Sequence, residues 1–359
     1  MAALTASAYT VPTDGPEADG TLAWTSTTLV LVQAAADGFT GLGWTYGPAP
    51  VAAVVTGMLA EVVEDIHPDD VPAAWTAMQR RLRNAGRPGI AGLALSAADN
   101  ALWDLKARRH GLPLTRLLGA VRASVPVYGS GGFTTYDADR QHAQLTGWVD
   151  GEGIPRVKIK IGESWGTDVP RDLARMAAAR KSIGDAELYV DANGAYQPKQ
   201  AIRVMQAAAD LDVRWFEEPV SSDDLPGLRQ VRDAVDPDVA AGEYGYDLVY
   251  FARMAPYVDC LQIDVTRCGG ITGFQRAAAV AAAHGLEVSG HCAPHQHLAV
   301  AAATPNLRHL EWFHDHVRIE RLLFDGAGAA EGGTAAADPG GRGNGLTLRE
   351  ADAARWRVC

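Results

Sequence analysis

Three carboxylates stand at the ends of three short apolar runs, at even spacing along the chain. Asp191 ends Leu-Tyr-Val-Asp, Glu217 ends Arg-Trp-Phe-Glu and Glu243 ends Ala-Ala-Gly-Glu, and both intervals, 191 to 217 and 217 to 243, are 26 residues. This interval matches one strand-plus-helix unit, so the acids would converge at one end of parallel strands, where like charges repel. A hard divalent cation removes that conflict. The spacing predicts a metal site of oxygen ligands, which favours Mg²⁺ or Mn²⁺ over zinc.

A short run with two lysines precedes the first acid. In residues 157–161, Val-Lys-Ile-Lys-Ile, Lys158 and Lys160 share one face because side chains alternate along a strand. A barrel packs its outer face on helices, so we expect both lysines to point inward, where each needs a facing acid. An edge strand with solvated lysines is the alternative. A lysine beside a second cation can have its pKa lowered enough to act as a base.

A histidine and an aspartate end two further apolar runs. Asp264 ends Leu-Gln-Ile-Asp and His291 ends Val-Ser-Gly-His. On adjacent strands the carboxylate can bind one ring nitrogen, fix the tautomer and raise the basicity of the other nitrogen. The pair predicts a general base, whereas a satisfied core histidine is the alternative for His291 alone. The sequence indicates no such partner for four other histidines, which we expect to be structural or to line the substrate: His295, His297, His314 and His316.

Short apolar segments alternate with helical segments after residue 122 and must position these side chains. This rhythm predicts a parallel (β/α) barrel. An open doubly wound sheet is the alternative, but such a sheet gathers its ligand groups at one switch point, whereas polar residues here end at least six runs. We predict strands near 125–129, 156–161, 187–191, 213–217, 239–243, 260–264, 287–291 and 308–312.

The first 122 residues have the mixed pattern of an α+β domain. Ser96 and Asp99 have the spacing of a capping pair at the start of a helix. The Gly- and Pro-containing stretch 13–20 predicts a mobile loop. We expect strands at 27–34 and 41–46 and helices at 51–66, 71–84 and 96–110. Three parts follow: an α+β domain at 1–122, a catalytic barrel at 123–325, and a C-terminal segment at 326–359 that packs back on the first domain.

Composition narrows the classes of partner. Apolar residues make up 47% of the 359-residue chain and charged residues 21%, as in ordinary globular proteins. The net charge of -11, without a basic block, argues against binding to nucleic acid. We find no signal peptide, no membrane-spanning run and no disulfide or zinc pattern among the four cysteines. We therefore expect a cytoplasmic protein with reduced thiols and no membrane partner.

Taken in order, the motifs resemble those of the enolase superfamily, and within it the mandelate racemase-like subgroup. The resemblance implies a modified (β/α)₇β barrel with an N-terminal α+β capping domain, and a homo-oligomer. It covers nearly the whole chain. It rests on Lys158-Ile-Lys160, Asp191-Ala-Asn-Gly, Glu217-Glu-Pro, Gly242-Glu243, Asp264 with the downstream Gly269-Gly-Ile-Thr272, Ser289-Gly-His291, and Glu311.

The resemblance also assigns roles to these residues. It implies Mg²⁺ on Asp191, Glu217 and Glu243, and a substrate contact at Asn193. Lys160 corresponds to the base on one face of the substrate, and His291, supported by Asp264, to the base or acid on the opposite face. Lys158 corresponds to the lysine beside a substrate carboxylate oxygen. Glu311 corresponds to the acid that hydrogen-bonds the developing enolate.

These roles predict removal of the proton next to a carboxylate, giving an enediolate. Loss of a β-hydroxyl then makes the protein an acid-sugar dehydratase, a lyase. Return of a proton on the other face makes it a racemase or epimerase of a 2-hydroxy acid, an isomerase. A Schiff-base aldolase is disfavoured because its mechanism gives the three acids no role. A non-catalytic scaffold is disfavoured because such a protein would have lost a metal ligand or a base, and none is missing in this sequence. A muconate-lactonising cycloisomerase is disfavoured because that subgroup has a lysine where this chain has Asp264 and His291.

Overall fold

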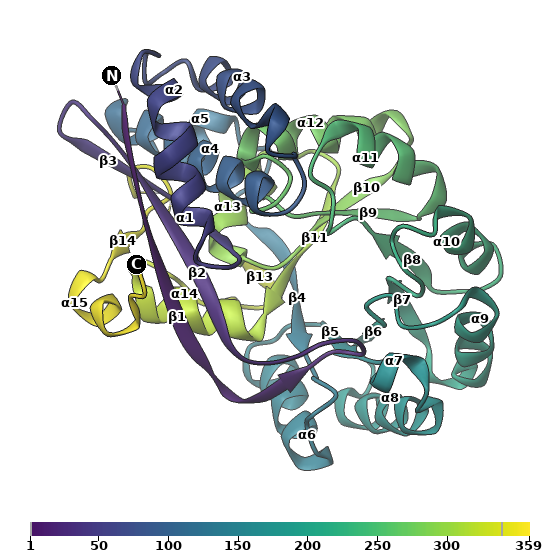
Figure 1. Cartoon of the computed structure of the whole chain (residues 1–359). Coiled ribbons are helices and arrows are strands. Elements are labelled where there is room, and N and C mark those ends of the chain that lie inside the picture. Colours follow the sequence, from purple (N-terminus) through teal and green to yellow (C-terminus); the bar gives the residue numbers. More distant parts are fainter. Residues whose placement is uncertain (1, 339) are drawn as a thin grey trace.

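Eight parallel strands form a closed barrel that carries the lysine and acid motifs. The computed structural model describes residues 2–338 and 340–359. In it β4 to β11 pair in chain order and β11 returns to β4 (Figure 1). This closure confirms the predicted barrel and excludes the open sheet. The strands are β4 Val125–Gly131, β5 Arg156–Lys160, β6 Glu187–Asp191, β7 Val213–Glu217, β8 Asp238–Ala241, β9 Cys260–Ile263, β10 Glu287–Gly290 and β11 Leu307–Phe313.

Helices surround the barrel and bury the outward-facing half of each strand. Val157 and Ile159 of β5 belong to the large core that the strands share with helices such as α8. Local signals set the helix boundaries: Asp168 accepts a hydrogen bond from the backbone N–H of Arg171 at the start of α8. The helices are α6 Ala138–Thr146 with the π-helical η3 Gly147–Gly151, α7 Glu163–Gly166, α8 Val169–Ile183, α9 Pro198–Ala207 with η4 Ala209–Leu211, α10 Leu225–Arg232, α11 Leu248–Met254 with η5 Ala255–Tyr257, α12 Gly270–Ala283, α13 Pro294–Ala302 and α14 His314–Leu323.

A three-stranded antiparallel sheet and its helices form a cap beside the barrel. The sheet has the order β1-β2-β3, and the β1–β2 hairpin reaches from the cap toward β5 and α7 (Figure 1). This arrangement confirms the predicted α+β capping domain. Its elements are β1 Ala3–Ala18, β2 Ala23–Ala36, β3 Phe39–Tyr46, α1 Val51–Val54, the π-helical η1 Val55–Leu59, α2 Ala60–Glu64, α3 Val71–Arg81, η2 Leu82–Asn84, α4 Ile90–Arg109 and α5 Leu114–Leu118.

The prediction of a loop at 13–20 is wrong. Strand β1 continues to Ala18, and its pairing with β2 shifts register between Pro12 and Glu17, so a bulge absorbs the Gly- and Pro-containing stretch. The barrel holds the hairpin tip at two points: Thr134 N donates to Ala18 O (2.8 Å) and Trp165 N to Gly20 O (2.9 Å). The hairpin therefore reaches the rim of the barrel as an ordered strand pair.

The predicted capping pair, Ser96 and Asp99, serves a different helix. Helix α4 begins at Ile90, and both residues lie buried in its interior. Ser96 Oγ accepts from Gly269 N (2.9 Å), and Asp99 accepts from Thr272 N (2.9 Å) and Thr272 Oγ1 (2.7 Å). The cap domain thus satisfies N–H groups at the start of α12 in the barrel. The prediction failed because sequence spacing does not say which helix end a buried polar side chain reaches.

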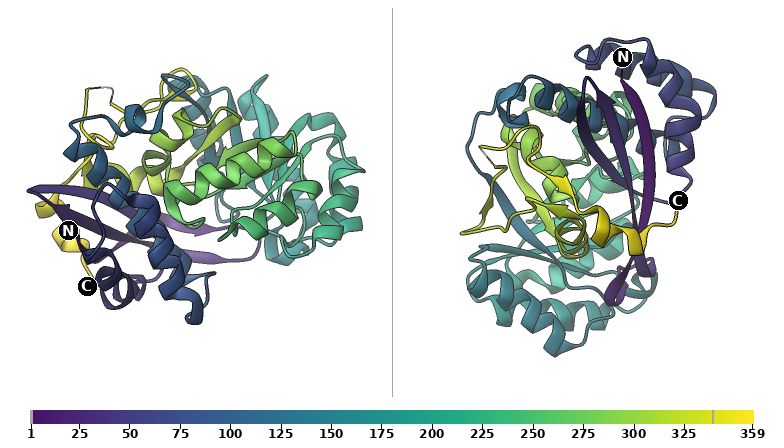
Figure 2. Two further views of the ribbon diagram at one scale, coloured as in Figure 1. Left: turned by 90° about the horizontal axis from the view of Figure 1, so that it is seen from above. Right: turned by 90° about the vertical axis from the view of Figure 1, so that its left-hand side faces the viewer.

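The C-terminal segment lies against the cap. Ala8 N donates to Cys359 O (3.1 Å), and Figure 2 shows the last residues beside the cap strands. β12 Phe324–Asp325 precedes this segment, which contains β13 Thr334–Ala335, β14 Thr347–Leu348, α15 Glu350–Ala353 and η6 Ala354–Trp356. The domain boundaries at residues 122 and 325 stay a prediction. Across the described residues no helix combines the length and apolarity needed to span a membrane.

Candidate active site

The three acids lie together at the C-terminal end of the barrel strands. Asp191 ends β6 opposite Glu217 of β7, and Glu243 follows β8 by two residues. All three are buried, and each offers an oxygen within 4.8 Å of the others. Glu243 Oε2 lies 3.2 Å from His291 Nε2, but the geometry is not that of a hydrogen bond. A buried carboxylate oxygen without a hydrogen bond, inside an oxygen-only cluster, fits a hard cation such as Mg²⁺.

Both lysines of β5 point into the barrel, as their alternation predicts. Lys158 Nζ lies 2.6 Å from Glu217 Oε1 and 2.7 Å from Glu311 Oε1, and Lys160 donates to Asp191 Oδ2. Burial favours the neutral amine, but the nearby carboxylates outweigh it and raise the pKa of both lysines. The prediction that Lys158 lowers the pKa of Lys160 is therefore wrong when only the charges of the protein itself act on Lys160. A divalent cation on the acids would offset this field.

His291 and Asp264 form the predicted dyad. His291 Nδ1 lies 2.8 Å from Asp264 Oδ2, while Asp264 Oδ1 accepts from both the backbone N–H and the hydroxyl of Thr266 (2.7 Å each). Burial opposes ionisation of Asp264, but the bond to His291 outweighs it and keeps the carboxyl pKa low. An ionised Asp264 accepts a hydrogen bond from Nδ1–H, so Nε2 is the nitrogen available for proton transfer.

Arg267 connects the dyad to the acid cluster. Its Nε lies 3.4 Å from Asp264 Oδ2 and its Nη1 lies 3.2 Å from Glu243 Oε1. One guanidinium thus contacts both a candidate metal ligand and the carboxylate behind the base. Arg267 therefore orients both groups relative to each other.

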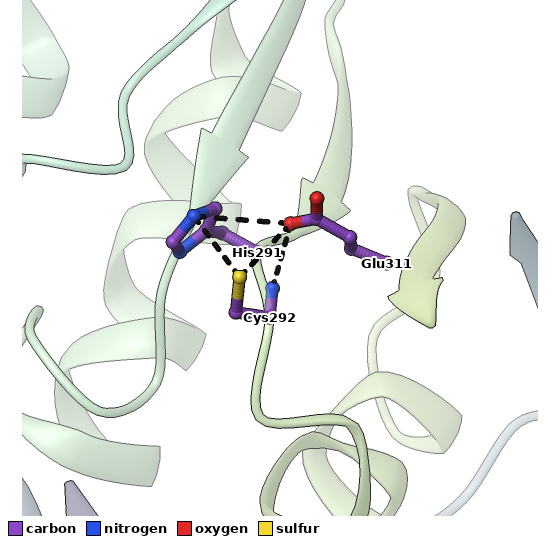
Figure 3. Close-up of side chains that lie close together, drawn as sticks. All are labelled: His291, Cys292 and Glu311. Carbon is purple, nitrogen blue, oxygen red and sulfur yellow. Dashed lines mark hydrogen bonds and ion pairs between the residues drawn. The ribbon is translucent and has the colours of Figure 1, made fainter. Parts of the chain in front are cut away.

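A tight turn after β10 brings an unexpected thiol into the site (Figure 3). Cys292 Sγ lies 3.2 Å from His291 Nε2 and 3.3 Å from Glu311 Oε2, and Cys292 N donates to the same oxygen (2.9 Å). Cys292 and Ala293 both have positive φ (50° and 38°), a strained conformation for side-chain-bearing residues. The turn thereby aims Cys292 between the base and Glu311. In the sequence, its position directly after His291 was the only sign.

Glu311 accepts hydrogen bonds on both oxygens. Ser130 Oγ (2.6 Å) and Lys158 reach Oε1, and Cys292 reaches Oε2. Burial raises the pKa of Glu311, but Lys158 and His291 outweigh it and hold the pKa well below its usual range. Glu311 is thus an acceptor in this charge state, and it must take up a proton before it can donate to an enolate as the sequence predicts.

Two further polar groups border the acid cluster. Asn193, the predicted substrate contact, has positive φ (45°), and its N–H donates to Asp191 Oδ1 (2.8 Å). Within the described part of the chain, neither Asn193 Oδ1 nor the buried Glu218 Oε1 has a hydrogen-bond partner. Unpaired buried acceptors beside a ligand cluster leave bonding capacity for a bound molecule. In the sequence, Glu218 stands in the motif Glu217-Glu-Pro with no role of its own.

The four histidines that the sequence left as structural or substrate-lining have distinct partners. His295 Nδ1 lies 2.6 Å from Glu320 Oε2, an acid partner that sequence reasoning missed because α14 supplies it. His297 Nε2 accepts from Val265 N (2.9 Å), and His314 Nε2 lies 3.0 Å from Asp14 Oδ2. His316 Nδ1 accepts from Ala293 N (3.1 Å). His295 and His297 use both ring nitrogens in such contacts, whereas among the described residues His314 and His316 each use one.

Comparison with known families decides the relationship. Residues 8–119 match the mandelate racemase/muconate lactonizing enzyme N-terminal domain, and residues 140–352 match the enolase C-terminal domain-like family. The chain belongs to the mandelate racemase/muconate lactonizing enzyme family. Membership confirms the resemblance inferred from the ordered motifs.

Characterised members of this family differ in their reactions. The chain is 33% identical over 304 residues to L-talarate/galactarate dehydratase of Salmonella typhimurium (81% of this chain, 74% of the relative). It is 36% identical over 262 residues to D-galactarolactone cycloisomerase of Agrobacterium fabrum (71% and 68%), and 32% over 275 residues to a hydrophobic dipeptide epimerase of Roseobacter litoralis (74% and 77%). Dehydratases, cycloisomerases and epimerases are thus all relatives.

Solved structures of family members agree closely with the fold. A mandelate racemase/muconate lactonizing enzyme-like protein from Rubrobacter xylanophilus matches with a TM-score of 0.96 at 49% identity over 99% of each chain. A racemase from Streptomyces coelicolor with bound magnesium matches with a TM-score of 0.91 at 30% identity over 100% of each chain. The magnesium in that family member agrees with the oxygen ligand set found in this chain.

Proposed function

We propose that the protein removes the proton α to the carboxylate of an acid sugar, with Mg²⁺ as cofactor, and then eliminates water. One observation carries this proposal: Lys160 and His291 contact two different acids of one buried cluster, Asp191 and Glu243. A substrate carboxylate bound at the cluster would therefore have a nitrogen base on each side of its α-carbon. Strong similarity to an acid-sugar dehydratase supports the choice of substrate class.

The residues divide the work of the first step. Asp191, Glu217 and Glu243 would hold Mg²⁺, which stabilises negative charge on the substrate carboxylate when bound. Lys160 takes the proton from the α-carbon, and the C–H electrons move into the carboxylate to form an enediolate. Lys158 supplies positive charge beside one oxygen. Glu311, after taking up a proton, donates a hydrogen bond to the enediolate.

The second step uses the opposite side of the site. The His291 imidazolium gives its Nε2 proton to the β-hydroxyl, the C–O bond breaks, and water leaves. The enol product then becomes a 2-keto-3-deoxy acid. Asp264 stabilises the imidazolium through Nδ1, and Cys292 and Glu311 hold the ring from the other side.

Racemisation or epimerisation of a 2-hydroxy acid is the second candidate. The same two bases would carry it, because His291 could return a proton to the α-carbon instead of protonating a leaving group. The epimerase relative supports this reaction class. In that case the substrate keeps all its oxygens.

An assay in D₂O separates these reactions. Purified protein with Mg²⁺ is incubated with a panel of acid sugars and 2-hydroxy acids. Formation of a semicarbazide-reactive keto acid supports dehydration, and deuterium at the α-carbon without keto acid supports epimerisation. If no compound of the panel gives either keto acid or α-deuterium, the proposal is overturned. Borohydride trapping of a substrate adduct, insensitive to EDTA, would instead indicate a Schiff-base aldolase.

A further inference from the structure

An aromatic cavity lies between the cap and the barrel, next to the proposed base. It has a volume of about 260 Å³, and its walls include Trp24, Tyr46, Phe313 and His316, together with the hydroxyl-bearing stretch 26–28. Phe313 also belongs to a buried cluster with Phe133 and Cys292, and Cys292 Sγ contacts His291 Nε2. Contacts through Phe313 and Cys292 therefore connect the wall of the cavity to the base.

His316 presents a hydrogen-bond donor in this wall. Its ring stacks on Tyr46 (centroids 3.4 Å apart, 5° between planes) and meets the edge of Phe313 (4.9 Å, 82°). Because Nδ1 accepts from Ala293 N, the proton of the neutral ring lies on Nε2. Burial holds the pKa of His316 well below its usual range, so the ring stays neutral. No group in the described ranges, 2–338 and 340–359, hydrogen-bonds Nε2.

The charge around the cavity disfavours a second anion. Its described lining residues include no lysine, arginine, aspartate or glutamate. Acids lie directly behind the wall: Thr27 donates to Asp315 and Tyr46 to Glu320 (3.2 Å). Arg318, the cation beside Asp315, is already paired with that carboxylate. A carboxylate placed in this cavity would lose water, meet no free cation and face acids.

We infer that this cavity is the subsite for the end of the substrate remote from the reacting carboxylate, and that His316 Nε2 donates to a neutral hydroxyl or ether oxygen there. The aromatic walls suit the C–H faces of a carbon skeleton, and the donor suits an uncharged oxygen. The substrate is then a sugar monoacid rather than a diacid. This inference rests on the proposed function, because that function sets the reacting carboxylate at the acid cluster.

Calorimetry of the full chain with Mg²⁺ tests the inference independently of turnover. Six-carbon aldonates are compared with the matching aldarates on the wild type, His316→Phe and His316→Gln. Phe keeps the aromatic stack but removes the donor, and Gln keeps an N–H donor. The exposed His284→Gln serves as a control. We expect the wild type to bind an aldonate at least tenfold tighter than its aldarate, and His316→Phe to lose about tenfold of aldonate affinity. His316→Gln should recover part of that loss.

Two results would overturn the inference: equal or tighter binding of the aldarate by the wild type, or unchanged aldonate affinity in a folded His316→Phe. Thermal melts establish that the variants fold. If the protein binds aldonates selectively and through His316 but does not catalyse α-deuterium exchange, the subsite is supported and the proposed function is overturned. If both acid classes undergo α-deuterium exchange and neither depends on His316, the proposed function is supported and the subsite is overturned.

Discussion

Lys160 donates a hydrogen bond to Asp191, so the proposed base and a proposed metal ligand share one contact. A protonated lysine cannot accept a proton, and the acids around Lys160 raise its pKa and so keep it protonated. A cation on Asp191 would compete with Lys160 for the carboxylate. The base and the metal site are therefore coupled, and changing either one should alter the other.

Removal of one ligand should abolish Mg²⁺ binding at the cluster. We expect Glu217→Gln to weaken Mg²⁺ affinity at least 100-fold, because a neutral amide replaces a carboxylate ligand. Calorimetry with Mg²⁺ measures the loss, and EDTA should silence the wild type in the D₂O assay. Glu350→Gln, at the surface, is the control. Unchanged Mg²⁺ affinity in Glu217→Gln would place the cation elsewhere.

Each base should serve a separate proton transfer. We expect Lys160→Ala and His291→Asn to lower kcat by about 10²- to 10⁴-fold, the range for loss of a general acid or base. If dehydration is the reaction, Lys160→Ala should lose α-deuterium exchange, whereas His291→Asn should retain exchange and lose keto-acid formation. NMR in D₂O follows both. The exposed Lys199→Ala controls for loss of a lysine, and exchange at the wild-type rate in Lys160→Ala would contradict its role.

Substitution of Asp264 in the dyad should lower kcat without weakening Mg²⁺ binding. Asp264→Asn replaces the negative carboxylate that accepts the hydrogen bond from Nδ1–H with a neutral amide. His291 therefore loses its fixed tautomer and the stabilisation of its imidazolium. We expect kcat to fall by about 10²-fold or more. Mg²⁺ affinity should change less than threefold, since Asp264 is outside the ligand cluster. Equal losses in both quantities would indicate a structural defect instead.

The hydrogen bonds between α4 and α12 should contribute to stability. Asp99→Ala leaves the N–H and hydroxyl of Thr272 without their acceptor in a buried place. We expect a decrease of about 1–3 kcal/mol in the free energy of unfolding, measured in urea. The exposed Asp210→Ala should change it by less than about 0.5 kcal/mol. A double-mutant cycle with Thr272→Val should reveal coupling, and strict additivity would rule out the pair.

Glu17 should make stability depend on pH. Burial, aided by the nearby Asp315, raises the pKa of Glu17 from 4.5 to about 8. The folded state therefore binds this proton more tightly than the unfolded state, and the resulting stability is complete below pH 4.5 and lost as the pH rises toward 8. Glu17→Gln should remove a slope of about 1 kcal/mol per pH unit across that window. Urea unfolding from pH 5 to 8 measures it, with Glu350→Gln as control; an unchanged slope would contradict the assignment.

The sequence by itself determined the barrel, the inward lysines and the convergence of the three acids. These features follow from local periodicity: side chains alternate along a strand, and one strand-plus-helix unit returns the chain to the same end of the barrel. The Asp264–His291 pair was accessible for the same reason, since both residues end adjacent strands.

Only the tertiary structure decided the contacts between distant segments. Ser96 and Asp99 cap a helix 173 residues further along the chain, and Cys292 reaches Glu311 through a strained turn. The raised pKa of Lys160 and the neutral donor of His316 likewise depend on which carboxylates and N–H groups surround them. Electrostatic fields and hydrogen-bond partners act through space, whereas sequence periodicity reports only the local direction of each side chain.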